Sequence, residues 1–227
     1  MDYEIIGNTM PMLELKLSKE ESIFAQTGAM QWMDAAIKME TEMKGGIFGA
    51  IKRSFSGEDM FVVNFSSEEE GAKVAFGHTY PGKIIPLDLS KGTIVCQQRS
   101  FLCAQNSVEY NLYFHQRLSS GFFGGEGFIM QKLSGSGMAF IEIDGECVEK
   151  ELKEGERIKV DTGSVGAFEE TVSMNIELVK GFKNMFFGGE GMFLTTLTGP
   201  GKVWIQTMPI QCMVGEIYNY MPKPKSN

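Results

Sequence analysis

A chain of 227 residues with 43% hydrophobic and 22% charged residues is long enough to bury a sizeable core and too apolar to remain disordered. Its formal net charge of −8 repels a phosphate backbone and therefore disfavours nucleic-acid binding. No apolar run reaches the roughly 18 residues that a membrane span requires, and the acidic start Met1-Asp2-Tyr3-Glu4 differs from a basic leader sequence.

Period-two alternation of apolar and polar residues predicts β-strands along most of the chain. In chain order, the alternating runs are Leu13–Leu17, Ile37–Met43, Ile141–Ile143 and Met174–Leu178. Glycine-rich turns separate the predicted strands every ~8–12 residues, which is typical of a sandwich or barrel. The sequence therefore predicts an all-β fold.

An internal repeat organises these strands. The six letters F-F-G-G-E-G occur at Phe122–Gly127 and again at Phe186–Gly191, 64 residues apart when measured from Gly125 to Gly189. A degenerate first copy lies at Phe55–Glu58. Repeats of this length indicate stacked units that cannot bury their apolar faces alone. We predict one continuous domain of three β-units with internal pseudo-threefold symmetry, covering 1–77, 78–144 and 145–210, and a partly mobile C-terminal extension at 211–227.

A second motif recurs in phase with the first. We expect each copy to end one strand, and the copies are Leu17-Ser18-Lys19, Leu89-Ser90-Lys91-Gly92 and Leu152-Lys153-Glu154-Gly155. A short strand and a turn follow each copy, and the predicted turns are Thr27-Gly28, Arg99-Ser100 and Thr162-Gly163.

Three glutamates, Glu58, Glu126 and Glu190, occupy matching places in the repeat. One hypothesis is that they form a shared cation site or a carboxylate cluster. The interpretation that we favour is structural, because each carboxylate can accept hydrogen bonds from backbone N–H groups that its own tight glycine turn leaves free.

The segments preceding these glutamates combine phenylalanine, glycine and cations. Their candidate contact residues are Phe48, Lys52, Arg53, Arg117, Phe122, Phe123, Lys180, Lys183, Phe186 and Phe187. One hypothesis places the aromatic rings on the surface, as a contact for a partner chain or an anionic lipid surface. The alternative, which we favour, is that the phenylalanines close the ends of the β-core while the cations are solvated.

Motifs for catalysis and metal binding are missing from the sequence. A cupin-type metal site needs an H-x-H pair with further ligands, whereas this chain has only His78 and His115. No G-x-S-x-G elbow or Cys–His motif is present, and the glycine-rich run Ser134–Gly137 is expected to be a hairpin turn. Cys96, Cys103, Cys147 and Cys212 form no C-x-x-C pair, which favours reduced thiols in a cytoplasmic protein. We expect no enzyme activity, no cofactor and no metal.

Several of these motifs occur together in a known family. They are T-G-A-M at Thr27–Met30, K-M-E-T-E-M-K-G-G at Lys38–Gly46, the two F-F-G-G-E-G copies, and L-T-G-P-G at Leu197–Gly201. In these motifs the chain resembles the altered-inheritance-of-mitochondria (mitochondrial biogenesis) family, from about Glu4 to Ile210. The resemblance implies a double-stranded β-helix fold similar to the tryptophan RNA-binding attenuation protein (TRAP), no established activity for prokaryotic members, and a link of the mitochondrial member to inner-membrane organisation.

The leading functional hypothesis is a non-catalytic structural or scaffold protein that acts through protein or membrane-surface contacts. The alternative is a small-molecule-binding module with a cavity in or between β-units. RNA binding or an orphan enzyme comes third, because fold similarity does not transfer function. Exposed strand edges at the ends of the array are compatible with homo-oligomers.

Overall fold

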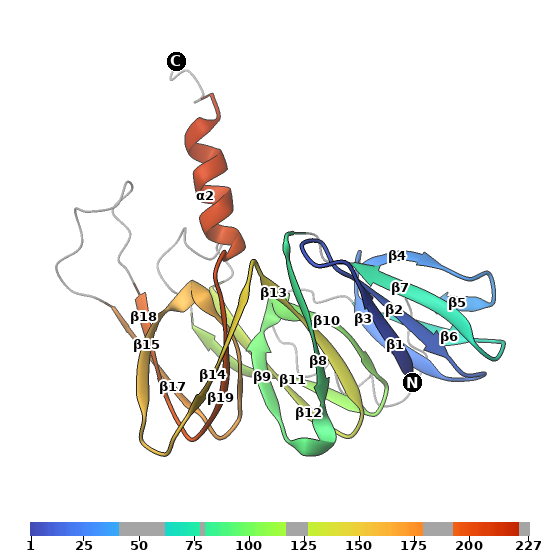
Figure 1. Ribbon diagram of the computed structural model, residues 1–227, viewed down its shortest axis with the longest axis horizontal. Coiled ribbons are helices and arrows are strands. Elements are labelled where there is room, and N and C mark those ends of the chain that lie inside the picture. Colours follow the sequence, from blue (N-terminus) through green and yellow to red (C-terminus); the bar gives the residue numbers. More distant parts are fainter. Residues whose placement is uncertain (41–61, 78–79, 117–126, 179–192, 223–227) are drawn as a thin grey trace.

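The computed structural model describes residues 1–40, 62–77, 80–116, 127–178 and 193–222 (Figure 1). These residues form β-strands, short single-turn 3-10 helices and one α-helix, so the all-β prediction is confirmed. The unusual feature is that the strands after the first fall into three successive sets of six.

The strands of the three sets have the following bounds. The first strand of the chain, β1 (Asp2–Ile6), precedes the sets. The first set contains β2 (Met12–Leu17), β3 (Ser22–Gln26), β4 (Met30–Met33), β5 (Ile37–Glu40), β6 (Val62–Ser67) and β7 (Ala72–Gly77). The second set contains β8 (Gly82–Asp88), β9 (Ile94–Gln97), β10 (Phe101–Gln105), β11 (Val108–Gln116), β12 (Phe128–Gly135) and β13 (Met138–Asp144). The third set contains β14 (Cys147–Leu152), β15 (Arg157–Asp161), β16 (Val165–Glu169), β17 (Ser173–Leu178), β18 (Phe193–Thr198) and β19 (Gly201–Gln206).

One pairing pattern recurs in all three sets. The sixth strand pairs with the first and the third, as β7 does with β2 and β4, β13 with β8 and β10, and β19 with β14 and β16. The fifth strand pairs with the second and the fourth. Even the β-bulge of the third strand recurs, between Met30 and Trp32, between Phe101 and Cys103, and between Val165 and Ala167. Each set is therefore a sandwich of two three-stranded halves.

Neighbouring sets share sheets. The second strand of one set pairs with the third strand of the next, as β3 does with β10 and β9 with β16. The described strands thereby form four sheets in the orders β1-β2-β7-β4, β5-β6-β3-β10-β13-β8, β11-β12-β9-β16-β19-β14 and β15-β18-β17. The three sandwiches stand in a row, with the first set at one end and the third at the other (Figure 1). Three apolar clusters, which we call the first, second and third core, fill them.

The sequence pattern explains this packing. On β2, Leu13, Leu15 and Leu17 are fully buried in the first core, whereas Glu14 and Lys16 lie on the opposite face. On β13, which belongs to a shared sheet, both faces are covered, because Phe140 lies in the first core and Ile141 in the second. Alternation therefore marks the strands, and the sharing of sheets buries the second face.

The predicted strand ends and turns are confirmed. β2 and β14 end at Leu17 and Leu152, β8 ends immediately before Leu89, and 3-10 turns occupy Gln98–Ser100 and Thr162–Ser164. The predicted hairpin at Ser134–Gly137 is wrong, because β12 and β13 belong to different sheets. That connection crosses from one layer of the sandwich to the other.

The α-helix, α2 (Ile210–Tyr220), occupies the predicted C-terminal extension from its second residue onward. We did not predict a helix there. The helix rises from the junction of the second and third sets and extends away from the sandwiches (Figure 1).

Candidate functional site

The candidate contact residues from the sequence lie outside the described residues, and so do the three glutamates. They are Phe48, Lys52, Arg53, Glu58, Arg117, Phe122, Phe123, Glu126, Lys180, Lys183, Phe186, Phe187 and Glu190. Their assignment stays a prediction. The strands place these three segments in one topological position, since each one connects the fourth strand of a set to the fifth.

The base of α2 is fixed to the β-body. The side chain of Ile210 is only 7% exposed, and its backbone N–H donates a hydrogen bond to Asp144 Oδ2 at 2.9 Å. Asp144 ends β13, so a strand of the second set anchors the first turn of the helix. An acidic side chain at a helix N-terminus also interacts favourably with the helix dipole.

The rest of α2 carries exposed apolar side chains. Val214, Ile217, Tyr218 and Met221 follow the i, i+3, i+4, i+7 spacing that places residues on one side of a helix. Their exposed fractions are 56%, 52%, 62% and 56%, and the neighbouring Tyr220 is 88% exposed. We call Val214, Ile217, Tyr218 and Met221 the α2 apolar face.

Such a helix is not self-sufficient in water. An isolated helix shorter than ~12–15 residues is marginal, and α2 has 11 residues with Gly215 in its middle. Its N-cap residue, Pro209, makes no side-chain capping hydrogen bond. Contiguous exposed apolar side chains commonly mark an interaction surface. The α2 apolar face is therefore the strongest candidate for a contact site in the described part of the chain.

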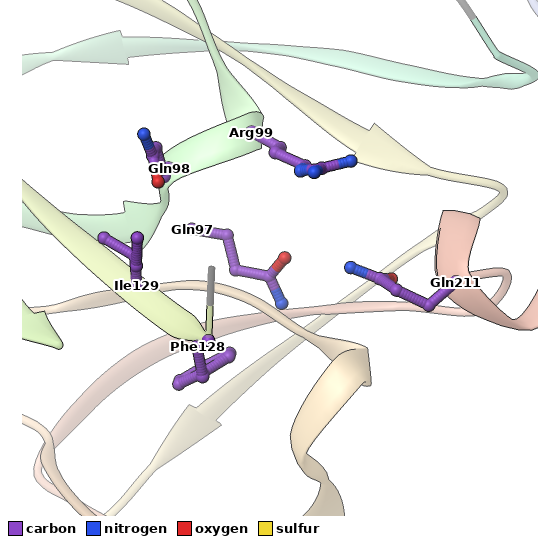
Figure 2. Close-up of a pocket in the computed structure, with 7 residues that line it drawn as sticks. Gln97, Gln98, Arg99, Phe128, Ile129 and Gln211 are labelled. Atoms are coloured by element: carbon purple, nitrogen blue, oxygen red, sulfur yellow. The ribbon is translucent and has the colours of Figure 1, made fainter. Parts of the chain in front are cut away.

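A small pocket, with a cavity volume of about 20 Å³, lies beside the foot of α2. It is lined by the end of β9, the following 3-10 turn, the start of β12 and the first turn of α2, through Gln97, Gln98, Arg99, Gly127, Phe128, Ile129 and Gln211. The amide groups of Gln97 and Gln211 point toward one another across it (Figure 2). The pocket therefore lies between the second set and the helix.

Hydrogen bonds limit what this pocket can offer a ligand. Gln97 Nε2 donates to the carbonyl oxygens of Gly163 at 3.2 Å and Val165 at 2.6 Å, so this amide group holds the two sets together. Gln206 Nε2 donates to the same Gly163 oxygen at 2.7 Å. Gln211 Oε1 is buried without a hydrogen-bond partner, and it could accept a hydrogen bond from a small polar molecule.

The buried titratable groups are held in their neutral forms. Burial raises the pKa of the Cys96 thiol to about 12 and that of Cys103 well above its usual value. Burial also raises the pKa of Glu142 to about 9, with a smaller contribution from the negative charge of Asp144. These thiols are protonated at neutral pH and are weak nucleophiles in that form. All four cysteines are free, as predicted.

Two sequence questions concern metals and membranes. His78 and the side chain of His115 lie outside the described residues. Within the ranges that the structure describes, no three or more His, Cys, Asp or Glu side chains converge to hold a metal ion. No helix in those same ranges has the length and apolar character needed to cross a bilayer.

Comparisons with known proteins place this architecture in a family. Residues 3–208 match the family described as "Mitochondrial biogenesis AIM24". The chain is 28% identical over 221 residues to "Uncharacterized protein M6_Spy0233" of Streptococcus pyogenes serotype M6, with 93% of this chain and 87% of that protein covered. The crystal structure of protein SPYM3_0169 from Streptococcus pyogenes superimposes with a TM-score of 0.78 at 26% identity, covering 97% of this chain and 99% of the streptococcal chain. The predicted resemblance is thereby confirmed: this protein belongs to the mitochondrial biogenesis AIM24 family.

Proposed function

We propose that this protein is a non-catalytic scaffold that binds another protein through the α2 apolar face. The observation that carries the proposal is the exposure of Val214, Ile217, Tyr218 and Met221 on a helix whose base is packed against the β-body. A helix of this kind binds by laying its apolar side into a groove of the partner. The side chains at positions i, i+3, i+4 and i+7 then serve as the anchors in that groove.

The charge of the helix favours a protein partner over an anionic membrane surface. Interfacial membrane helices are typically rich in Lys and Arg on their polar side. The sequence of α2 contains one charged residue, Glu216, and the whole chain has a net charge of −8. Both features oppose attraction to an anionic lipid headgroup, so the partner should present an apolar groove.

Site-specific photo-crosslinking in the native cells tests this proposal. A photoreactive amino acid at position 217 lies on the α2 apolar face, and one at position 216 on the polar side is the matched control. We expect one defined protein adduct from position 217 and none from position 216. Ile217→Asp, combined with the photoreactive residue at position 218, should abolish the adduct. Because Ile217 is 52% exposed, this variant should keep the thermal stability of the β-body.

Equal crosslinking from positions 216 and 217 would contradict the proposal. Co-sedimentation of the protein with anionic vesicles, if Ile217→Asp abolishes it, would also contradict the proposal, because the α2 apolar face would then bind lipid. Purified protein with vesicles of phosphatidylcholine and phosphatidylserine at low salt provides that comparison.

Three further elements of the proposal derive from the sequence. The phenylalanine- and cation-containing segments are additional contacts, supported by their common position between the fourth and fifth strands. The recurring strand pairing supports three similar units of a TRAP-like double-stranded β-helix, and their pseudo-threefold symmetry stays a prediction. The free state of all four cysteines supports a cytoplasmic location.

A second candidate function is small-molecule binding in the pocket at the foot of α2. The buried Gln211 Oε1 without a partner favours it. Native mass spectrometry of the purified protein should then detect a bound molecule, and Gln211→Leu should remove it. Gln98→Leu, at the opposite wall of the pocket, is the control and should retain the molecule if binding depends on Gln211 Oε1. Identical spectra for the wild type and both variants, free of any adduct, would eliminate this candidate.

A further inference from the structure

The two internal junctions of the molecule are built alike. In the first, Ala25 of β3 lies opposite Cys103 of β10, and in the second, Cys96 of β9 lies opposite Ala167 of β16. Both are antiparallel pairings of the second strand of one set with the third strand of the next. The second strand of the third set, β15, has no following set to pair with in the described part of the chain and lies at the edge of its sheet. The third strand of the first set, β4, likewise lies at the edge of its sheet.

An aromatic side chain crosses each internal junction. Phe140 lies opposite Cys103 in the second set but packs in the first core, and Trp204 lies opposite Ala167 in the third set but packs in the second core. Each cross-strand pair thus combines one small residue with one aromatic residue, and the aromatic ring fills the core of the preceding set.

The first set has the same pair with the sizes exchanged. Trp32 on β4 lies opposite Ala75 on β7, at the positions that Cys103 and Phe140 hold in the second set. Within the described residues no other set covers this position, and Trp32 is 37% exposed. Phe140 is fully buried by comparison. Trp32 is therefore an aromatic group in a junction position without a core to enter.

At the opposite end of the row, β15 has an apolar side chain that is incompletely buried. Ile158 on β15 holds the position of Ile23 and Ile94, as its pairing with Leu197 indicates. Ile23 and Ile94 are buried, at 0% and 7% exposure, whereas Ile158 is only partly buried. β4 and β15 lie at opposite ends of the row, so they cannot pair within one chain without a large rearrangement (Figure 1).

We propose that a second copy of this chain binds head to tail, with β15 of one copy pairing antiparallel to β4 of the next. The internal register places Val160 opposite the partner's Trp32, as Ala25 is opposite Cys103. The indole would then enter the third core, as Phe140 enters the first. The contact is heterologous, so repeated addition either closes a ring or extends a filament.

Lys159 sets the strength of this contact. It holds the position of Phe24 and Val95, which are fully buried at the internal junctions. Lysine on an edge strand weakens strand addition, and its ammonium group must stay hydrated while its stem lies along the junction. The association should therefore be weaker than the internal junctions and dependent on concentration.

Sedimentation velocity over a concentration series tests the proposal with full-length protein. Trp32→Ala removes the indole and should shift association to concentrations about tenfold higher. Lys159→Val introduces the residue that the second set has at this position, Val95, and should shift association to concentrations about tenfold lower. Lys150→Val, on the exposed edge strand β14, is the matched control and should leave association unchanged. Circular dichroism establishes that each variant folds.

A wild-type protein that stays monomeric at all concentrations, together with a monomeric Lys159→Val, would overturn the proposal. Association that Ile217→Asp abolishes and Trp32→Ala leaves unchanged would also overturn it, since it would assign self-association to α2. Loss of association in Trp32→Ala alone, with α2 variants unaffected, supports it independently of the proposed scaffold function.

Discussion

The side chain of Glu142 illustrates how this architecture treats single residues. It lies on β13, in a sheet that has apolar cores on both sides, and it is 9% exposed. The corresponding position of β19 holds Gln206, whose amide group accepts from the Asp144 backbone N–H at 3.2 Å and donates to Gly163. A neutral hydrogen-bonding group suits this position, and burial makes the glutamate neutral as well.

Glu142→Gln should therefore change the pH dependence of stability. The pKa of Glu142 is about 9 in the folded protein, against 4.5 for an unperturbed glutamate. The folded chain retains a proton that the unfolded chain releases, so this contribution to the free energy of unfolding is present below pH 4.5 and is lost as pH rises through 9. At pH 8 the variant should be more stable than the wild type by up to about 5 kcal/mol, since each pH unit above 4.5 costs the wild type about 1.4 kcal/mol.

Urea unfolding at pH 5 and pH 8 measures this difference, with Glu151→Gln on exposed β14 as the control. The stabilisation by Glu142→Gln should grow from pH 5 to pH 8. A variant whose unfolding free energy follows the wild-type curve at both pH values would show that Glu142 ionises normally.

Residue types alone predicted part of this environment. The alternation at Ile141–Ile143 identified the strand, but Glu142 then belonged on a polar face. It is buried because β10 pairs with β3 of the preceding set and places the first core against that face. Pairing between residues so far apart in sequence leaves no local pattern, so the burial could not be predicted.

At the scale of elements, α2 is the part of the structure that we failed to predict. Its signals are present in the sequence: Pro209 precedes the helix, Pro222 follows it, and Val214, Ile217, Tyr218 and Met221 have helical spacing. We read residues 211–227 as an extension because the repeat ends before them. The β-strands, by contrast, were predictable wherever alternation or a recurring turn marked them.

Gly215→Ala should stabilise α2. A Cβ at this position would meet nothing within 4 Å, so alanine should add about 0.5–1 kcal/mol to the free energy of helix unfolding. Hydrogen exchange followed by mass spectrometry should show slower exchange of the α2 amides and unchanged exchange in the sandwiches.

Gly155→Ala is the matched control for this experiment. Its Cβ would also meet nothing within 4 Å, but Gly155 has a φ of +73°, which strains any L side chain. We expect it to lower the midpoint of thermal unfolding. Unchanged α2 exchange in Gly215→Ala would show that tertiary contacts, rather than helix propensity, limit the opening of this helix.

At the scale of the whole molecule, shared sheets bind the three sets into one cooperative structure. Each shared sheet takes three strands from each of two sets, and the second core contains residues of all three sets, such as Phe24, Phe101 and Trp204. The repeat in the sequence predicted that sets of strands recur, but the strands that join one set to the next carry no motif of their own.

Phe101→Ala should accordingly destabilise the whole chain in a single transition. Phe101 is fully buried, and its ring centroid lies 5.3 Å from that of Phe24 and 4.6 Å from that of Tyr110. Its truncation should cost about 3–5 kcal/mol. Differential scanning calorimetry should show one peak at a lower temperature. Two separated peaks, with one at the wild-type temperature, would mean that the sets unfold independently.

The unequal accessibility of the four thiols has a practical consequence. Cys96 and Cys103 are buried, Cys147 is half-buried, and Cys212 on the first turns of α2 is exposed. A maleimide dye added to the native protein should attach at position 212 ahead of the other three, without any engineered cysteine. The label would then sit on α2, on the same side of the helix as Glu216, where a change in its emission on mixing with a candidate partner would report docking of the helix.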